Sequence, residues 1–479
     1  MPPSPASISS PLTLPHSGRK LRNRFSKSAT TECLANPLDH LPTPQHSTLY
    51  ETWGASGCGM IVTGNVMVNG IHLESPRNLA LYADTRVDDK DSCSPARLDA
   101  FKKLSAAIHK HDKTTLAIMQ INHPGRQSPV AVTGARGSPI APSAVPLKLP
   151  KLGALTPLIF HPPTAMTNVS ILATITSFVS TAQLAEQAGF DGVQIHAAHG
   201  YLISQFLSPS ANLRSTFYGG TRAARRRFLT EVVTKIRDKV KKSFVVSIKL
   251  NSSDFLADGF DEDACVDLIA ELSKLKALDF IEISGGTYGN AEMMLDPASS
   301  RRRGSGAKSA FFQSFCDRLA KAETTELPIM CTGGFRTRTQ ITAALESSLQ
   351  IIGLARPLCV QPTFPRDFLA GTVDQVDDYT LKIPGPLAPL LEPALNNFWH
   401  QRQIHKLAKG GQPELSLGYV YSLTVQLLLA YVFDPAMHPQ ISKGLVYALV
   451  GVVVLFVPRD AVFFLGGLVI AARATSKYR

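Results

Sequence analysis

The chain has 479 residues, of which 44% are hydrophobic and 18% charged, a balance that supports a large buried core and excludes a globally disordered protein. Its formal net charge of +12 lies partly in short arginine clusters with no nucleic-acid recognition module beside them, so we predict no nucleic-acid partner. The seven cysteines are scattered without CxxC spacing, which predicts neither a disulfide framework nor a zinc site and favours a reducing compartment.

Short apolar or β-branched segments recur through the first three-quarters of the chain. Between most of them lie stretches in which apolar residues return every three or four positions, as in helices: 95–109, 179–188, 225–240, 261–275 and 338–346. Strands that alternate with helices form a parallel sheet, and eight such units close into a (β/α)8 TIM barrel. The predicted strands are 25–30, 59–64, 115–121, 192–196, 244–250, 279–283, 329–332 and 350–354.

Two segments outside this alternation set the predicted domain limits. Residues 1–10 are rich in Pro and Ser and lack the apolar core of a secretory signal, which predicts a disordered lead-in before a barrel domain at 11–410. Segment 125–163 is dense in Pro, Gly, Ser and Ala and follows the third predicted strand. It is consistent either with a lid over the barrel mouth or with a surface insertion.

Residues 411–479 form an apolar C-terminal tail, predicted to be helical, that a barrel does not need. Its stretch 415–433 has nineteen residues and no charged side chain, close to the length that crosses a bilayer. A second stretch, 444–472, is interrupted by Arg459 and Asp460, which are costly in lipid. Two alternatives follow: membrane association through 415–433 and 444–472 with a cytoplasmic-facing barrel, or helices packed on the barrel or on a partner chain. No oligomeric state is predicted.

The segment 190–220 carries the most informative motif, HAAHGY, in which His196, His199 and Tyr201 directly follow an apolar strand. That position predicts a place at the C-terminal mouth of the barrel. Two imidazoles can donate hydrogen bonds to one carbonyl oxygen, and a phenol can give a proton to a nearby carbon. A metal site would need further ligands that the segment lacks, so we predict no metal, and the two histidines alone are also compatible with a structural role.

This motif resembles the signature of the old yellow enzyme family, the NADH:flavin oxidoreductases. Further segments agree with the family in the expected order over roughly 11–410: NR at 23–24, SATT at 28–31, GMIVTG at 59–64, MQINHPGRQ at 119–127, CTGGF at 331–335 and GLARP at 353–357. The resemblance implies an FMN cofactor at the barrel mouth, with NADPH or NADH as the reductant.

The resemblance implies contacts to the flavin ring for five residues. Ser28, Ala29 and Thr31 would lie against the ring, where Thr31 would tune the flavin through its carbonyl or N5 edge. Gly64 would be small enough to let the flavin approach. Gln120 would bond the pyrimidine edge.

The resemblance also implies the groups that meet the negative charge of the cofactor. Lys249 in SIKLN would face N1 and the C2 carbonyl, where the family usually has Arg. Gly333 and Gly334, with Arg356 as the counter-charge, would hold the phosphate. Ala355 stands where the family usually has glycine.

The activity implied by the resemblance is ene reduction. NAD(P)H would reduce the flavin, and an α,β-unsaturated carbonyl compound would then accept hydride at Cβ while His196 and His199 polarise its carbonyl and Tyr201 protonates Cα. One alternative is a related flavin oxidoreductase acting on a quinone, nitro or biosynthetic substrate, which would differ in residues such as Tyr288. The other is a non-catalytic, membrane-tethered barrel scaffold, suggested by the two departures from the family pattern and by the tail.

Overall fold

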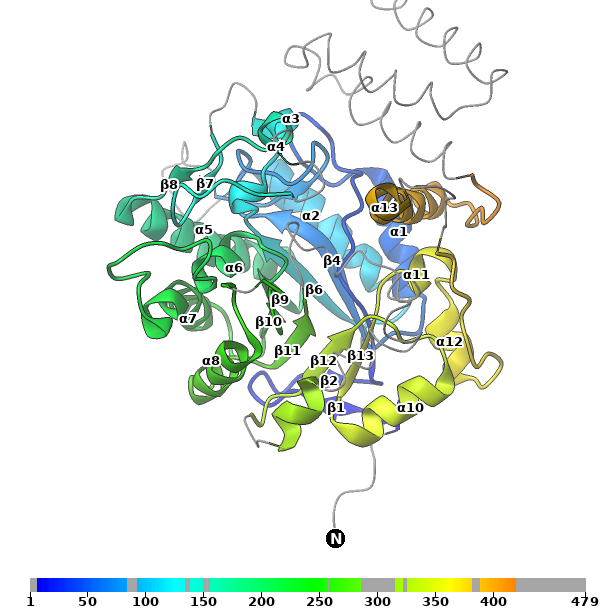
Figure 1. Cartoon of the computed structure of the whole chain (residues 1–479). Helices are drawn as coiled ribbons and strands as arrows, with labels where there is room; N and C mark the ends of the chain where they lie inside the picture. The colour runs from blue at the N-terminus through cyan, green and yellow to red at the C-terminus, as the bar shows by residue number, and fades with distance from the viewer. Residues whose placement is uncertain are drawn as a thin grey trace, which may run out of the picture.

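A computed structural model describes residues 7–83, 93–133, 138–149, 153, 156–256, 258–285, 315–321, 325–380 and 388–418 (Figure 1). Its centre is a closed barrel of eight parallel strands, which confirms the predicted fold class. The barrel closes where β3 pairs with both β4 and β13. The strands are β3 (Phe25–Lys27), β4 (Met60–Met67), β6 (Leu116–Asn122), β9 (Gly192–Ala197), β10 (Val245–Asn251), β11 (Phe280–Ser284), β12 (Ile329–Thr332) and β13 (Ile351–Leu354).

All eight predicted strands overlap a barrel strand. Nearly every residue in these strands is buried, because side chains on one face fill the barrel and those on the other pack beneath helices. The short β5 (Leu79–Ala80) extends the sheet beyond β4, and β7 (Ile140–Ala141) pairs with β8 (Thr164–Ala165) in a separate two-stranded sheet.

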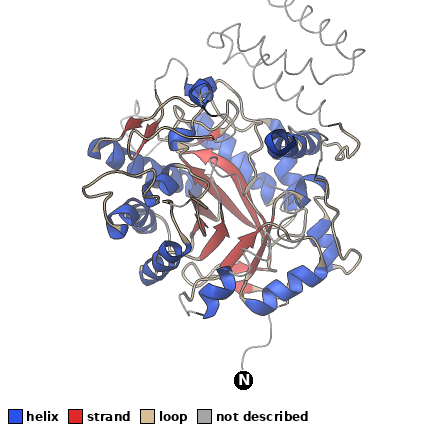
Figure 2. Cartoon of the chain, in the orientation of Figure 1, coloured by secondary structure: helices blue, strands red, loops and turns tan. Residues whose placement is uncertain are grey.

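Helices surround the barrel on its outer face (Figure 2). Helix α5 begins eleven residues before the predicted 179–188 segment, because Thr167 caps it by accepting a hydrogen bond from the Ser170 backbone. The outer helices are α1 (Pro44–Gly54), α2 (Pro95–Ile108), α5 (Asn168–Gln187), α7 (Arg222–Lys239), α8 (Glu262–Lys274), α10 (Arg338–Ser347) and α12 (Phe364–Leu369). Shorter helical elements are η1 (Gly125–Gln127), α3 (Val130–Thr133), α4 (Thr156–Ile159), α6 (Leu202–Leu207) and α11 (Pro357–Val360).

Helix α1 was not predicted from the sequence. Its buried face includes His46 and Gly54 as well as aromatic residues, so its apolar period is weak. Gly54 is nevertheless required where it stands, because a Cβ there would lie 2.3 Å from the carbonyl oxygen of Ile108 at the end of α2. The close approach of α1 to α2 therefore depends on this glycine.

The arginine cluster on α7 binds the neighbouring helix α8. Arg226 lies 3.0 Å from Glu271, and Arg222 lies 3.1 Å from Asp267. These partly exposed ion pairs each contribute little to stability. Their carboxylates on α8 neutralise part of the positive charge of the arginine cluster.

The N-terminal end of the barrel is closed by a hairpin of β1 (Leu12–Thr13) and β2 (Lys20–Leu21). Leu14 and Leu21 from this hairpin pack among barrel side chains such as Met60 and Phe280. The backbone N–H of Arg24 donates to the carbonyl of Ile8, and its guanidinium donates to the carbonyl of Ser10. Residues 7–10 of the predicted lead-in thus lie against the barrel, and residues 1–6 lie outside the described part.

Helix α13 (Ala388–Leu407) follows the barrel and packs beside α1 and α11 (Figure 1). The segment after it folds back: the Trp399 indole donates to the carbonyl of Leu417 at 2.9 Å, and the Glu414 backbone donates to Gln403 at 2.7 Å. Residues 411–418, at the start of the predicted tail, therefore pack on α13. The described residues end at Gly418, so residues 419–433 of the first apolar stretch and all of 444–472 lie outside them.

One described helix, α5, is long and apolar enough to cross a membrane, and 56% of its apolar window is buried inside the structure. A helix that covers a barrel is buried in this way. The length and apolar composition of α5 are therefore weak evidence for membrane insertion.

Candidate active site

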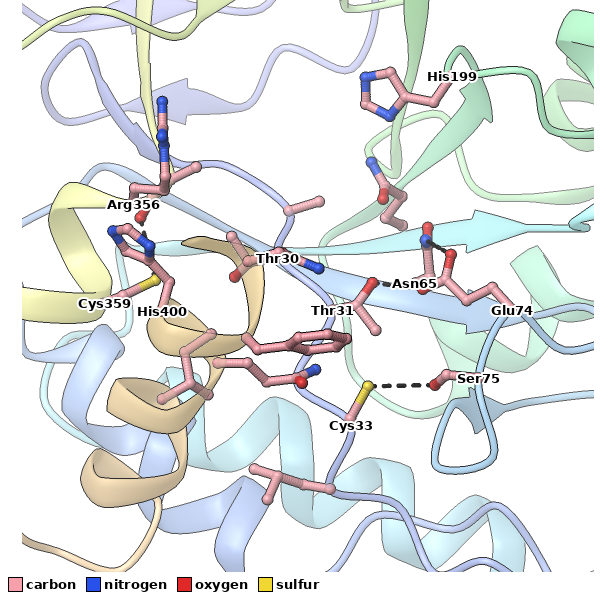
Figure 3. Close-up of a pocket in the computed structure, with 18 of the residues that line it drawn as sticks. Thr30, Thr31, Cys33, Asn65, Glu74, Ser75, His199, Arg356, Cys359 and His400 are labelled. Atoms are coloured by element: carbon pink, nitrogen blue, oxygen red, sulfur yellow. Dashed lines mark hydrogen bonds between the residues drawn. The ribbon is translucent and has the colours of Figure 1, made fainter. Parts of the chain in front are cut away.

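A cavity of about 640 Å³ opens at the C-terminal ends of the barrel strands (Figure 3). This volume lies in the range of small-molecule sites. Helix α13 forms part of its wall, with residues such as Phe398 and Arg402. The predicted site residues that line it are Ala29, Thr31, Gln120, His196, His199, Tyr201, Lys249, Gly333, Gly334, Ala355 and Arg356.

The HAAHGY motif brings three rings together on one wall of the cavity. His196 lies on β9, and Tyr201 is the residue before α6. The centroid of the His196 ring lies 5.0 Å from that of His199 and 4.8 Å from that of Tyr201. The fold therefore brings the three side chains of the motif together.

The protonation state of His196 follows from its surroundings. Burial lowers its pKa well below the usual value, and the neighbouring His199 and Lys249 lower it further, so the imidazole is neutral. Its Nδ1 accepts a hydrogen bond from the backbone N–H of Ala198 at 3.2 Å, which leaves the proton on Nε2. His196 thus offers one N–H donor.

His199 is held in an unusual backbone conformation. Its φ of 60° lies in the left-handed region, which few residues other than glycine adopt, and its backbone N–H donates to Asn251 Oδ1 at 3.0 Å. The ring Nε2 lies 2.7 Å from the Ser284 hydroxyl. Local strain of this kind often occurs at functional sites.

A carboxyl group that the sequence analysis missed lies beside Tyr201. The Tyr201 hydroxyl donates a hydrogen bond to Glu74. Asn65 Nδ2 donates to the same carboxylate at 2.8 Å, and Thr31 Oγ1 donates to it at 2.5 Å (Figure 3). This hydrogen bond to Glu74 fixes the orientation of the Thr31 hydroxyl. No local pattern around Glu74 marks it as functional.

A chain of polar side chains runs through the barrel beneath the cavity. Gln120 Nε2 donates to Gln194 at 2.6 Å, and Gln194 Nε2 donates to Glu282 at 2.8 Å. The other oxygen of Glu282 lies 2.8 Å from the ammonium of Lys249 and accepts from Thr332 at 2.7 Å. Glu282 was also missed, although a charged residue in a buried strand was a usable signal.

The predicted phosphate-binding groups meet at the ends of β12 and β13. Gly333 and Gly334 have φ values of 122° and 82°, conformations that favour glycine and in which successive backbone N–H groups can bind an anion. A Cβ on Gly333 would meet nothing within 4 Å, so this backbone borders open space. Arg356 lines the same cavity. These donors fit the phosphate of FMN, and the buried Thr30 hydroxyl, which has no partner among the described groups, adds a further polar atom on the wall.

Two predicted flavin contacts do not line the cavity. Ser28 is fully buried, with its hydroxyl 2.7 Å from that of Thr332. At Gly64 a Cβ would lie 2.5 Å from the Thr30 carbonyl oxygen and 2.2 Å from a carboxylate oxygen of Glu32. The absence of a side chain at Gly64 is therefore required by these protein groups, and the prediction that it makes room for flavin remains a prediction.

Three further features considered from the sequence are a metal site, a lid formed by segment 125–163, and the residue Tyr288. Among the described residues, no group of three or more His, Cys, Asp or Glu side chains gathers as a metal site. The described part of segment 125–163 supplies no residue to the cavity wall. Tyr288 lies outside the described residues.

Fold and site together define a TIM barrel whose mouth holds a cavity lined by His196, His199 and Tyr201 and by Gly333, Gly334 and Arg356. The chain belongs to the NADH:flavin oxidoreductase / NADH oxidase family, whose model matches residues 8–375. An NADH-dependent flavin oxidoreductase of Aspergillus parasiticus is 35% identical over 397 residues, which cover 81% of this chain and 82% of that relative.

Two solved structures share the fold. The old yellow enzyme homologue from Zymomonas mobilis superposes with a TM-score of 0.60 at 22% identity, over 78% of this chain and 95% of that one. A 2-naphthoyl-CoA reductase bound to 2-naphthoyl-CoA gives 0.66 at 20% identity over 76% of this chain, which spans about half (52%) of it. The protein is therefore an FMN-dependent, NAD(P)H-dependent oxidoreductase of the old yellow enzyme type.

Proposed function

We propose that this protein reduces the C=C bond of an α,β-unsaturated carbonyl compound with electrons from NADPH or NADH. The observation that carries the proposal is the placement of His196, His199 and Tyr201 on one cavity wall, with ring centroids 4.8 and 5.0 Å from that of His196. Bound FMN supplies hydride transfer between the nicotinamide and the substrate carbon.

The protein side chains have distinct roles in this reaction. The Nε2–H of neutral His196, together with the ring of His199, binds the substrate carbonyl oxygen and draws electron density from the double bond. Tyr201, which is only 4% exposed, holds its hydroxyl proton for the substrate Cα. The donors on Gly333, Gly334 and Arg356, which line the same cavity, hold the cofactor phosphate.

The decisive experiment separates the two half-reactions. The purified, FMN-loaded protein is titrated anaerobically with NADPH or NADH while the flavin absorbance is followed, and cyclohexenone is then added. We expect bleaching followed by recovery. Bleaching that only a quinone or a nitro compound reverses would replace the enone with that acceptor, and the absence of any flavin signal after FMN is added would support the non-catalytic scaffold.

The proposed reaction assigns no role to the apolar C-terminal tail, 411–479. Membrane association through 415–433 and 444–472 stays one of two alternatives, based on length and composition, and the other is helices packed on the barrel or on a partner chain. All of the cavity-lining residues in the described part of the chain lie at or before 409, so the proposed reaction is assigned to barrel residues.

A further inference from the structure

Glu74 is the carboxyl group nearest the proposed proton donor, and it lies in the loop between β4 and β5. One carboxylate oxygen accepts from the Tyr201 hydroxyl and from Asn65 Nδ2, and the other accepts from the Thr31 hydroxyl at 2.5 Å. These donors come from three separate parts of the chain. Figure 3 shows the side chains of Thr31 and Asn65 pointing toward Glu74.

The loop holds this carboxyl group in a fixed place. The side-chain oxygen of Asn78 accepts from the backbone N–H groups of Glu74 and Ser75, both at 2.8 Å, and its nitrogen lies 3.3 Å from a carboxylate oxygen of Glu74. Asn78 is itself 1% exposed. A buried amide that binds both backbone and side chain in this way fixes the loop conformation and the direction of the carboxyl group.

Exposure differs between the two partners. Tyr201 is almost fully buried, whereas Glu74 is half-buried in the cavity wall. A phenol that loses its proton in a closed site needs a route by which the proton is replaced. Glu74 lies in direct contact with the phenol oxygen and also reaches solvent.

We propose that Glu74 positions Tyr201 and restores its proton during each turnover, an inference that rests on the proposed ene reduction. As hydride bonds to the substrate Cβ, the electron pair of the C=C bond moves toward Cα. The Tyr201 O–H bond breaks and a C–H bond forms at Cα. The carboxylic acid of Glu74 gives its proton to the tyrosinate oxygen, and water then protonates the carboxylate.

In the structure Glu74 accepts a hydrogen bond from Tyr201, and in the proposed step water first protonates Glu74, so that this hydrogen bond reverses and Glu74 donates to the Tyr201 oxygen. A carboxylate in contact with the tyrosinate oxygen would place two negative charges side by side and oppose the loss of the phenol proton. A carboxylic acid at the same place neutralises the phenolate as it forms. The net reaction adds one hydride, supplied by NAD(P)H, and one proton, supplied by water.

The test uses the FMN-loaded, full-length protein and compares Glu74→Gln, Tyr201→Phe, the double variant and the surface control Glu326→Gln. Rapid-mixing absorbance measures reduction by NADPH, and separately reoxidation of the reduced protein by cyclohexenone and by a quinone. General acid–base groups typically contribute a factor of roughly 10² to 10⁴. We expect Glu74→Gln to slow reoxidation by cyclohexenone at least about tenfold more than reoxidation by the quinone, whose oxygens take protons directly from water.

Two further readouts distinguish a proton route from a structural role. The solvent deuterium isotope effect on reoxidation by cyclohexenone should rise in Glu74→Gln, and this substitution should add little to Tyr201→Phe, because the two residues act in one step. Equal slowing with both acceptors, or additive effects in the double variant, would overturn the relay. If Glu74→Gln does not retain FMN, Glu74→Ala, which also lacks the carboxyl group, carries the same test, with the same rise in the isotope effect expected.

Failure of the relay is distinguishable from failure of the proposed function. If the unmodified protein is not reoxidised by cyclohexenone, the ene reduction fails and the relay falls with it. If the unmodified protein is reoxidised and Glu74→Gln behaves like Glu326→Gln, only the relay is wrong.

Discussion

The ammonium of Lys249 lies 2.8 Å from a carboxylate oxygen of Glu282, and the two side chains are 6% and 0% exposed. The resemblance to the family assigns Lys249 to the flavin edge that becomes negative on reduction. A carboxylate in contact with that ammonium offsets its field, and the low local dielectric makes both charges effective. The positive charge of Lys249 therefore favours the reduced flavin, and the negative charge of Glu282 disfavours it.

We predict that Glu282→Gln raises the midpoint potential of the bound FMN. Removal of the negative charge leaves the field of Lys249 unopposed, so the reduced flavin is stabilised. A stabilisation of about 1.4 kcal/mol corresponds to about 30 mV for a two-electron couple. An anaerobic dye-coupled titration measures the shift, with Glu326→Gln as the control.

A lowered or unchanged potential in Glu282→Gln would contradict this assignment of Lys249. The same substitution should destabilise the fold, because removing one partner of a buried pair typically costs about 3–5 kcal/mol. Replacing both partners, in Lys249→Met with Glu282→Gln, leaves no uncompensated buried ammonium and keeps an acceptor for Gln194 and Thr332, so it should cost less than Glu282→Gln alone.

Lys27 yields a prediction about stability and pH. It is fully buried on β3 without an ion-pair partner among the described carboxylates, with its ammonium 3.9 Å from the centroid of the Trp53 ring, and burial lowers its pKa to about 8. The pKa in the unfolded chain is near 10.5, so the folded state carries a penalty of roughly 3 kcal/mol below pH 8. The contact with Trp53 offsets part of it. Lys27→Met should therefore increase the free energy of unfolding at pH 7 by roughly 2 kcal/mol.

The sign of the pH dependence follows from the same shift. Between about pH 8 and 10.5 the unfolded chain holds the proton that the folded chain has released, so the unmodified protein gains stability as the pH rises. Lys27→Met lacks this gain, and the two stability curves should converge. Urea unfolding at several pH values measures it; parallel curves would show that Lys27 keeps an ordinary pKa.

Gly64 yields a prediction about packing. A Cβ there would lie 2.2 Å from Glu32 and 2.5 Å from the Thr30 carbonyl oxygen, so Gly64→Ala must displace the polar group formed by Glu32 and Tyr50. Overpacking of this kind typically costs about 1–3 kcal/mol. Thermal unfolding should show a clear loss for Gly64→Ala and almost none for Gly418→Ala, where a Cβ would meet nothing within 4 Å. Equal melting temperatures would mean that the Glu32 side chain moves without cost.

The barrel could be predicted from the sequence because its strands are short, continuously apolar runs separated by turns and helices. Even the partly polar first strand, β3, was found, although only Phe25–Lys27 of the predicted 25–30 belongs to the sheet. Helix α1 could not be found because His46 and Gly54 interrupt its apolar face. The fold of 411–418 onto α13 depends on side-chain-to-backbone bonds, which leave no periodic signal.

The site was predicted wherever its residues form a local motif. His196, His199 and Tyr201 were recognisable because the strand end and the spacing place them together. Glu74 and Glu282 were missed because they meet Tyr201 and Gln194 across large sequence separations: 127 residues separate Glu74 from Tyr201, and 88 separate Glu282 from Gln194. Only the closed barrel brings such pairs into contact.

The C-terminal limit of the barrel domain yields the last prediction. Residues 411–418 cover α13 through the Trp399 bond to Leu417 and the paired bonds between Gln403 and Glu414. A chain that ends at Gly410 loses these three bonds, each worth about 1 kcal/mol, and exposes the Trp399 ring. A chain that ends at Gly418 keeps them.

We therefore expect the chain ending at Gly418 to bind FMN and melt like the full-length protein, and the chain ending at Gly410 to lose roughly 3 kcal/mol of stability and, because α13 lines the cavity, to bind FMN more weakly. Equal stability of the two shortened chains would place the limit at 410 after all. The same pair tests the tail, because the chain ending at Gly418 lacks all but the first four residues of 415–433. If those stretches bind lipid, only the full-length protein should sediment with vesicles that contain anionic lipid.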